Sequence, residues 1–333
     1  MKYLSIISLY FLCSTNQLRA QNFTFSQPYS ISQSVNPAIV GTGLYQHRIQ
    51  SGLRSQFVGG DNLYSTLAVG WDTKINNKQS DIKNYMGIGF NILSDRLMAG
   101  VIQNNFISLN LAYHIYLDQN LYQNLAVALG GSFAQTNFDR TKLFFADQYD
   151  NAGGLIGTGS LESLVSSPST IFANTGVLYS LHNEISFLQA GVSANFANKP
   201  NLTYNYINES KGLRLTGLFN AETKVFYNNT VLMHGQYNVK EGVNQYSAGL
   251  AFSFPITTDW ELTKRLYIGC FTRNTEVVIP TISILTDKHS FGFSYDFNMT
   301  KANGAQLRRN LMEISFSKSF GYRKGDLSRT LFD

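Results

Sequence analysis

The sequence has few cysteines and few charged residues for its length. Its two cysteines are Cys13 and Cys270, and Cys13 falls in an expected export signal, so the mature chain keeps one thiol and forms no intramolecular disulfide. Charged residues make up 14% of the 333 residues, well below the ~25% of an ordinary soluble domain. After the N-terminus no run approaches ~18 consecutive apolar residues, which excludes a transmembrane helix.

The N-terminus predicts a cleaved signal peptide over residues 1–20. Lys2 supplies the positive end, residues 3–13 the short apolar stretch and residues 18–20 the cleavage site before Gln21. Leu12 stands in front of Cys13 where a lipoprotein signal has a small residue, which argues against lipidation. Cleavage removes Lys2 and Arg19, and the net charge then falls from +5 to about +3. That charge is too weak and too dispersed to indicate nucleic-acid binding.

What the sequence has in abundance is alternation of apolar with small or polar residues. Two runs within 105–135 place apolar side chains at most odd positions and Ser, Asn, Ala or Gly at most even ones. Successive side chains of a strand point to opposite faces, so each run has one apolar face. A soluble sheet gives the same alternation, but these runs exceed the ~5–6 residues of soluble strands and their polar face lacks Lys and Glu. Alternating runs of ~9–11 residues are typical of transmembrane barrels.

The fold class predicted from this pattern is all-β, a transmembrane antiparallel β-barrel of about 14 strands. Two regions, 169–181 and 265–286, do not sort polarity by parity, and Pro280 interrupts the second. The expected strands are residues 47–57, 63–71, 86–92, 107–117, 121–133, 169–181, 184–196, 212–226, 230–237, 245–254, 265–273, 276–286, 289–299 and 311–320.

The domain organisation follows from this strand count. Residues 21–46 are expected to form a periplasmic N-terminal segment entering the barrel, residues 47–320 the transmembrane barrel and residues 321–333 a C-terminal periplasmic tail. An even number of strands places both ends of the barrel in the periplasm. The long stretch 140–168 then lies outside the cell. The tail is either a solvated extension or a docking element for a periplasmic partner.

Signals for catalysis or metal binding are weak. The five histidines lack metal-ligand spacing, no Gly-x-Ser-x-Gly elbow is present, and the glycine-rich stretch 153–159 lacks the Lys-Ser/Thr of a phosphate loop. His114 and His234 fall on polar faces, where interior packing is expected. The sequence therefore predicts no enzyme, no metal and no cofactor.

Several charged residues are expected to face the barrel interior. Arg48, Arg54 and Gln56 share the polar face of the first strand, where they either line a conduit, anchor a plug or pair with other inward charges and fill the interior. Arg214 and Asp296 are similar inward candidates.

Four stretches of the mature chain resemble a known family. Asn36-Pro37-Ala38 with Gly41 is similar to the family's opening motif, and 54–59 to its second, although Phe57 replaces the usual Trp. The stretch 87–95, followed by 109–115, matches the third, and 129–139 the fourth. The chain is thereby identified as similar to the PorP/SprF family of type IX secretion and gliding-motility outer-membrane proteins from Bacteroidetes. The motif residues expected to matter are Asn36, Pro37, Ala38, Gly41, Arg54, Gln56, Phe57, Gly59, Gly89, Asn91 and Asp95.

The resemblance implies a function in the outer membrane of a Gram-negative bacterium. It implies a non-enzymatic barrel that anchors or displays a secreted, adhesin-like surface protein and couples it to periplasmic peptidoglycan-binding or motor-linked proteins. Outer-membrane lipid is the other implied partner. A transport channel for small solutes is the alternative, because small inward residues leave room for a lumen. A lipid-modifying enzyme is a third class and requires a Ser–His pair converging on one face.

Overall fold

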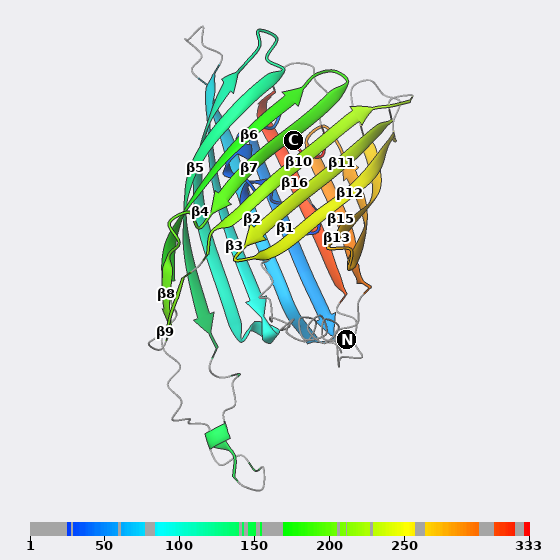
Figure 1. Ribbon diagram of the computed structural model, residues 1–333. Helices are drawn as coiled ribbons and strands as arrows, with labels where there is room; N and C mark the ends of the chain where they lie inside the picture. The colour runs from blue at the N-terminus through cyan, green and yellow to red at the C-terminus, as the bar shows by residue number, and fades with distance from the viewer. Residues whose placement is uncertain are drawn as a thin grey trace, which may run out of the picture.

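The computed structural model describes residues 25–27, 29–58, 61–76, 84–139, 142, 146–150, 154, 169–204, 207–210, 212–226, 229–256, 264–299, 310–323 and 330–333. Within these residues fourteen antiparallel strands close into one barrel, which confirms the predicted fold class (Figure 1). The first barrel strand pairs with the last, so the sheet has its backbone groups bonded across the seam. Such closure is what a sheet needs in lipid, where free backbone groups find no water.

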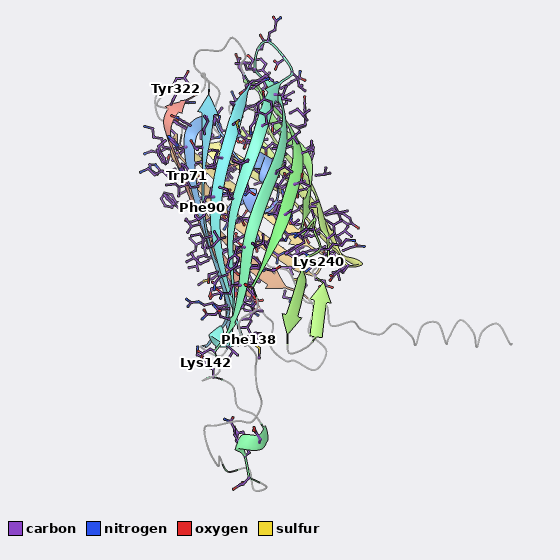
Figure 2. All side chains as sticks on the ribbon, turned by 90° about the vertical axis from the view of Figure 1, so that its left-hand side faces the viewer. Trp71, Phe90, Phe138, Lys142, Lys240 and Tyr322 are labelled. Carbon is purple, nitrogen blue, oxygen red and sulfur yellow. The ribbon has the colours of Figure 1, made fainter. Side chains whose placement is uncertain are left out.

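The barrel is built from long strands joined mostly to their sequence neighbours. Its strands are β1 (Tyr45–Val58), β2 (Asp61–Asn76), β3 (Tyr85–Leu97), β4 (Ile102–Tyr116), β5 (Gln123–Phe138), β6 (Ser169–His182), β7 (Ser186–Asn195), β10 (Arg214–Lys224), β11 (Thr230–Lys240), β12 (Val243–Pro255), β13 (Arg265–Arg273), β14 (Val277–Leu285), β15 (His289–Asn298) and β16 (Leu311–Arg323). β8 (Asn201–Tyr204) and β9 (Ile207–Ser210) form a separate two-stranded sheet between β7 and β10 (Figures 1 and 2).

Within the described residues, helical structure is confined to single turns. The 3-10 turns are η1 (Ser32–Ser34), η2 (Pro37–Ile39), η3 (Met98–Gly100) and η5 (Ala146–Gln148). In the described part of the chain no helix combines the length and apolar character needed to cross a membrane.

The two regions with poor alternation are nevertheless strands of the barrel. Residues 169–181 fall within β6, and Pro280 lies in the middle of β14. The ladder from β14 to β15 pairs Val278 with Phe297 and resumes at Thr281 with Ser294, so it skips the proline. Proline has no N–H to give to a ladder, and the lost pairing is the local consequence.

The two ends of the barrel are named here by the strands that reach them. At the proximal end β1 begins and β16 ends, and at the distal end β5 ends and β6 begins. Figure 2 shows the two ends, with Tyr322 at the proximal end and Phe138 with Lys142 at the distal end. The link 118–120 between the expected strands 107–117 and 121–133 lies at the proximal end, where the Asp118 carboxylate accepts the N–H groups of Tyr122 and Gln123 at 3.1 and 2.8 Å.

The outer face of the barrel is apolar. Trp71 and Phe90 point away from the interior (Figure 2), and Leu129 and Ile171 are each 69% exposed. Along β4 the odd-numbered side chains from 107 to 113 are exposed while the even-numbered ones from 108 to 114 are buried. This is the alternation that a lipid-facing barrel requires.

Two chain segments lie where the sequence-based expectation did not put them. Residues 25–27 and 29–43, called the N-terminal segment below, are largely buried inside the barrel (Figure 1). The expectation had been a periplasmic segment that leads into the barrel. Residues 330–333, called the C-terminal residues, are also buried inside it, and β16 continues to Arg323, three residues beyond the expected end. The physical reason is the inner wall, which is polar and lined with small residues and leaves a space that the two segments fill.

Candidate functional site

The inner wall of the barrel is shaped to receive the N-terminal segment. A Cβ atom built on Gly87 would lie 2.3 Å from the carbonyl oxygen of Val40, and one on Gly89 would lie 2.6 Å from both Val40 and Gln33. Real Cβ atoms do not approach other heavy atoms so closely, so glycine is what lets the N-terminal segment pack directly on strand β3. The glycines therefore mark the contact between the wall and the segment.

The distal part of the N-terminal segment is held by a buried carboxylate. Both oxygens of Glu313 accept main-chain hydrogen bonds, from Ser26 N at 2.6 Å and from Gln27 N at 3.0 Å. The Ser26 hydroxyl donates to Asp296 at 2.9 Å and accepts from Arg273 at 2.8 Å. Arg273 and Arg54 both face Asp296, at 3.1 and 3.6 Å. The two carboxylates and two guanidinium groups thus form one cluster in which positive and negative charges balance. Buried charges in proteins are usually paired in this way.

The middle of the N-terminal segment turns at Asn36 and Pro37. The Asn36 side chain accepts the Ala38 N–H at 2.9 Å and so caps η2, where proline occupies the first position. Its amide group donates to the carbonyls of Val177 and Val192, on β6 and β7, at 3.2 and 3.3 Å. The turn is therefore fixed to the wall as well as capped.

The proximal part is organised around Arg48 and Asp72. Arg48 donates two hydrogen bonds to the Asp72 carboxylate, at 3.0 and 3.1 Å. Asp72 also accepts the N–H of Gly41 at 2.7 Å, and Arg48 donates to the carbonyl of Ile39 at 3.3 Å. Gly41 has φ +78°, a conformation that favours glycine. A bidentate Arg–carboxylate pair is among the strongest polar contacts available to a protein.

Two aromatic side chains complete this proximal contact. His114 Nε2 lies 2.7 Å from the Val40 carbonyl oxygen, and because a carbonyl only accepts, the ring nitrogen is the donor. The His114 ring stacks on Tyr85 with centroids 4.3 Å apart, and the Tyr85 hydroxyl donates to the Gly41 carbonyl at 3.0 Å. His114 and His234 both face the interior, as the sequence predicts.

Tyr29 connects the N-terminal segment to the C-terminal residues. Its hydroxyl lies 2.5 Å from Ser283 on β14, and its ring meets Phe332 edge-on with centroids 6.5 Å apart. Arg48 donates to the carbonyls of Phe332 and Asp333 at 3.1 and 3.4 Å. One arginine therefore contacts the wall and both chain ends.

The structure separates the motif residues predicted from the sequence into three groups. The first group belongs to the seated segment or touches it: Asn36, Pro37, Ala38, Gly41 and Gly89. The second group lies on the inner wall: Arg54 beside Asp296, Asn91 near Gly70, and Asp95, which accepts a hydrogen bond from Thr66 at 2.7 Å. Gln56 is half-buried near the end of β1, Phe57 is described by its backbone alone, and Gly59 lies outside the described residues.

Sequence reasoning missed several interior residues that hold the segment. Glu313 and Asp72 were not assigned an interior role, although each is an acidic residue on the inner face of its strand, beside small and polar residues, which is a usable signal. Among the described residues no group of three or more His, Cys, Asp and Glu side chains is arranged to hold a metal ion. The site is thus a network of hydrogen bonds and ion pairs that seats two peptide segments.

Comparisons with known proteins give a family. The profile of the family described as type IX secretion system membrane protein PorP/SprF matches residues 18–317. No curated protein matches the sequence. Similar solved structures include the Pseudomonas putida toluene transporter TodX, with 10% identity, TM-score 0.44 and coverage of 90% of this chain and 95% of that one. BamA from Haemophilus ducreyi lacking POTRA domains 1–3 has 8% identity, TM-score 0.43 and coverage of 83% and 70%. At such values the functions of these neighbours carry no weight for this chain.

Proposed function

Because this chain belongs to the PorP/SprF family of type IX secretion system membrane proteins, we propose that it anchors or displays a secreted surface protein and couples it to periplasmic partners. The protein is an outer-membrane β-barrel of a Gram-negative bacterium, and its apolar outer face contacts lipid. The proposed role is non-enzymatic. The barrel serves as a fixed body in the membrane, with an adhesin-like protein held at its outer side and envelope proteins at its inner side.

The observation that supports this proposal most is the occupied interior. Barrels of ~8 strands are filled by their own side chains, whereas those of ~16–18 strands leave an aqueous channel. A fourteen-stranded wall lined by small residues has space to fill, and here the N-terminal segment and the C-terminal residues occupy it. A transport channel for small solutes, the alternative, needs a continuous passage. Seating both segments by buried ion pairs and glycine contacts favours an anchor over a channel.

Deletion of the gene tests the proposal in cells. We expect a type IX-secreted surface protein to leave the surface and to accumulate in the medium or inside the cell. Protease digestion of intact cells, followed by detection of that protein in the cell, medium and surface fractions, measures the change. The wild-type gene supplied in trans should restore display, and unaltered detergent sensitivity of the mutant excludes a general envelope defect. Normal surface display in the deletion strain would rule the anchoring role out.

A further inference from the structure

The C-terminal residues lie in a cradle at the proximal end of the barrel. The Phe332 ring stacks on Phe187 of β7, with centroids 5.7 Å apart and an interplanar angle of 11°. Tyr29 closes a second side of the ring, and Leu331 joins the same apolar cluster. Leu331 and Phe332 are 5% and 3% exposed. The cradle thus has an apolar slot of the size of one aromatic side chain.

The polar contacts of the cradle are made largely to main-chain groups, which every peptide has. Arg48 donates to the main-chain oxygens of Phe332 and Asp333. The Asp333 carboxylate lies 3.9 Å from the His182 ring nitrogen. Main-chain contacts give affinity without sequence preference, whereas the aromatic slot and the position of the carboxylate give selectivity.

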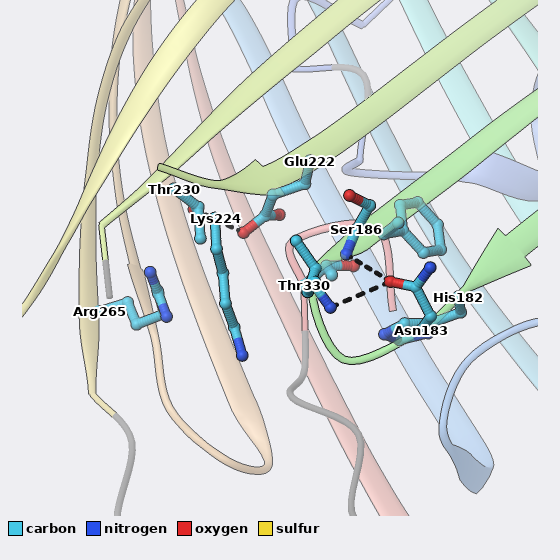
Figure 3. Close-up of a pocket in the computed structure, with 10 residues that line it drawn as sticks. His182, Asn183, Ser186, Glu222, Lys224, Thr230, Arg265 and Thr330 are labelled. Carbon is cyan, nitrogen blue, oxygen red and sulfur yellow. Dashed lines mark hydrogen bonds between the residues drawn. The ribbon is translucent and has the colours of Figure 1, made fainter. Parts of the chain in front are cut away.

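The cradle extends beyond the four residues that occupy it. A small open pocket adjoins Thr330, and its rim carries His182, Lys224 and Arg265, three basic side chains from different elements (Figure 3). The Glu222 side chain forms one wall and is bonded to Thr230 at 2.8 Å and Tyr267 at 2.7 Å. A second small pocket lies beyond Phe187, between Gly43 and Tyr122. Both pockets are small, of the size of a water molecule, so a longer ligand would extend along the open rim. There the cations of Lys224 and Arg265 outnumber the carboxylate of Glu222 and favour an acidic group.

The two segments in the interior are not held equally. The N-terminal segment is fixed to the wall at its distal, middle and proximal parts, through Glu313, Asn36 and Gly41. The C-terminal residues contact the wall only at the proximal end, and three of their hydrogen bonds are internal, between Thr330 and Asp333. They are therefore the less extensively anchored of the two segments.

We propose that the proximal mouth is a peptide-binding site, which the C-terminal residues Thr330–Asp333 occupy in the resting chain and a partner's peptide occupies in exchange. The matching peptide has an aromatic residue followed by an acidic one, with further acidic groups against the basic rim. That the partner is periplasmic rests on the proposed function, whereas the site itself does not. The chain's own end acts as an internal competitor, so the partner binds only when it outcompetes that end.

Binding of a peptide in trans tests the proposal. The probe is a fluorescein-labelled synthetic peptide with the sequence of residues 324–333, added to the purified full chain in detergent and followed by fluorescence anisotropy. In the Phe332→Ala chain the internal competitor lacks its aromatic side chain, and we expect the peptide to bind at least tenfold more tightly than to the wild type. A peptide with alanine in place of the phenylalanine should lose at least tenfold in affinity for the same variant.

Matched controls separate the exchange from general damage. Phe316→Ala removes an outward-facing aromatic side chain from β16 and should behave as the wild type. Deletion of residues 330–333 vacates the cradle without changing any wall residue and should bind the peptide as Phe332→Ala does. Equal affinity for the wild type and both variants, or equal binding of the alanine peptide, overturns the proposal. Loss of the heat-modifiable barrel band on gels in both variants also overturns it, because an exchangeable end is not needed for closure.

Discussion

At the residue scale, glycines on the inner wall determine where the N-terminal segment can pack. The glycines of β3 allow the N-terminal segment to pack directly on the strand backbone, as the 2.3 Å separation for a Cβ on Gly87 shows. Gly131 on β5 faces outward and has no atom within 4 Å of its built Cβ. The two positions thus form a natural pair, one in contact with the segment and one in open surroundings.

Gly87→Ala is expected to destabilise the protein by about 1–3 kcal/mol, the usual cost of forcing an extra methyl group into a packed interior. Gly131→Ala should change the free energy of unfolding by less than about 0.5 kcal/mol, as surface substitutions do. Urea unfolding in lipid vesicles measures both. Equal effects of the two substitutions would show that the segment does not pack on β3.

A second residue-scale prediction concerns Glu313, whose two oxygens accept the N–H groups of Ser26 and Gln27. In Glu313→Gln one acceptor becomes an NH₂ donor that faces a backbone donor, so we expect a loss of about 1.5–3 kcal/mol, the range for a hydrogen bond to a charged group. Glu276→Gln, at an exposed turn, is the control and should be neutral. A neutral effect of Glu313→Gln would contradict the role assigned to this carboxylate.

At the element scale, the strands were predictable and the filling was not. The alternation of apolar with small or polar side chains along 107–117 and 289–299 shows directly which face of each strand contacts lipid, because every second side chain must be apolar. The N-terminal segment has no such periodicity, since its polar and its apolar side chains are both buried. Asn36 bonds to the wall, whereas Ile39 and Val40 pack in an apolar cluster with residues of the wall. The signal for this segment lay elsewhere, in inward glycines such as Gly87 and Gly89 that are too small to fill a fourteen-stranded barrel. The same residues were interpreted as room for a lumen.

Amide hydrogen exchange tests the seating of the N-terminal segment as an element. The N–H groups of Ser26, Gln27 and Gly41 donate to buried carboxylates, so we expect them to exchange as slowly as the amides of the neighbouring strands. The exposed turn residue Thr275 gives the fast reference. Exchange of the segment at the rate of Thr275 would mean that it is unseated most of the time.

At the scale of the whole molecule, the closed sheet encloses the two seated segments. An anchoring role needs no open passage through such a barrel. Outer-membrane location and membership in a type IX secretion family follow from the fold and from the match over residues 18–317. The motif at 36–41 was recognised from the sequence, but its place inside the barrel depends on contacts with β2, β4, β6 and β7 that no local pattern encodes. In the proposed role the barrel is an anchor whose interior is filled by its own two end segments.

Single-channel conductance in planar lipid bilayers tests this central claim most directly. The wild-type chain is predicted to insert without stable conducting steps, and a variant with residues 26–41 replaced by a Gly/Ser sequence of equal length is predicted to conduct, because the wall alone leaves an aqueous space. A sustained open-channel conductance of the wild type, equal to that of the variant, would contradict the account and support a transport channel instead.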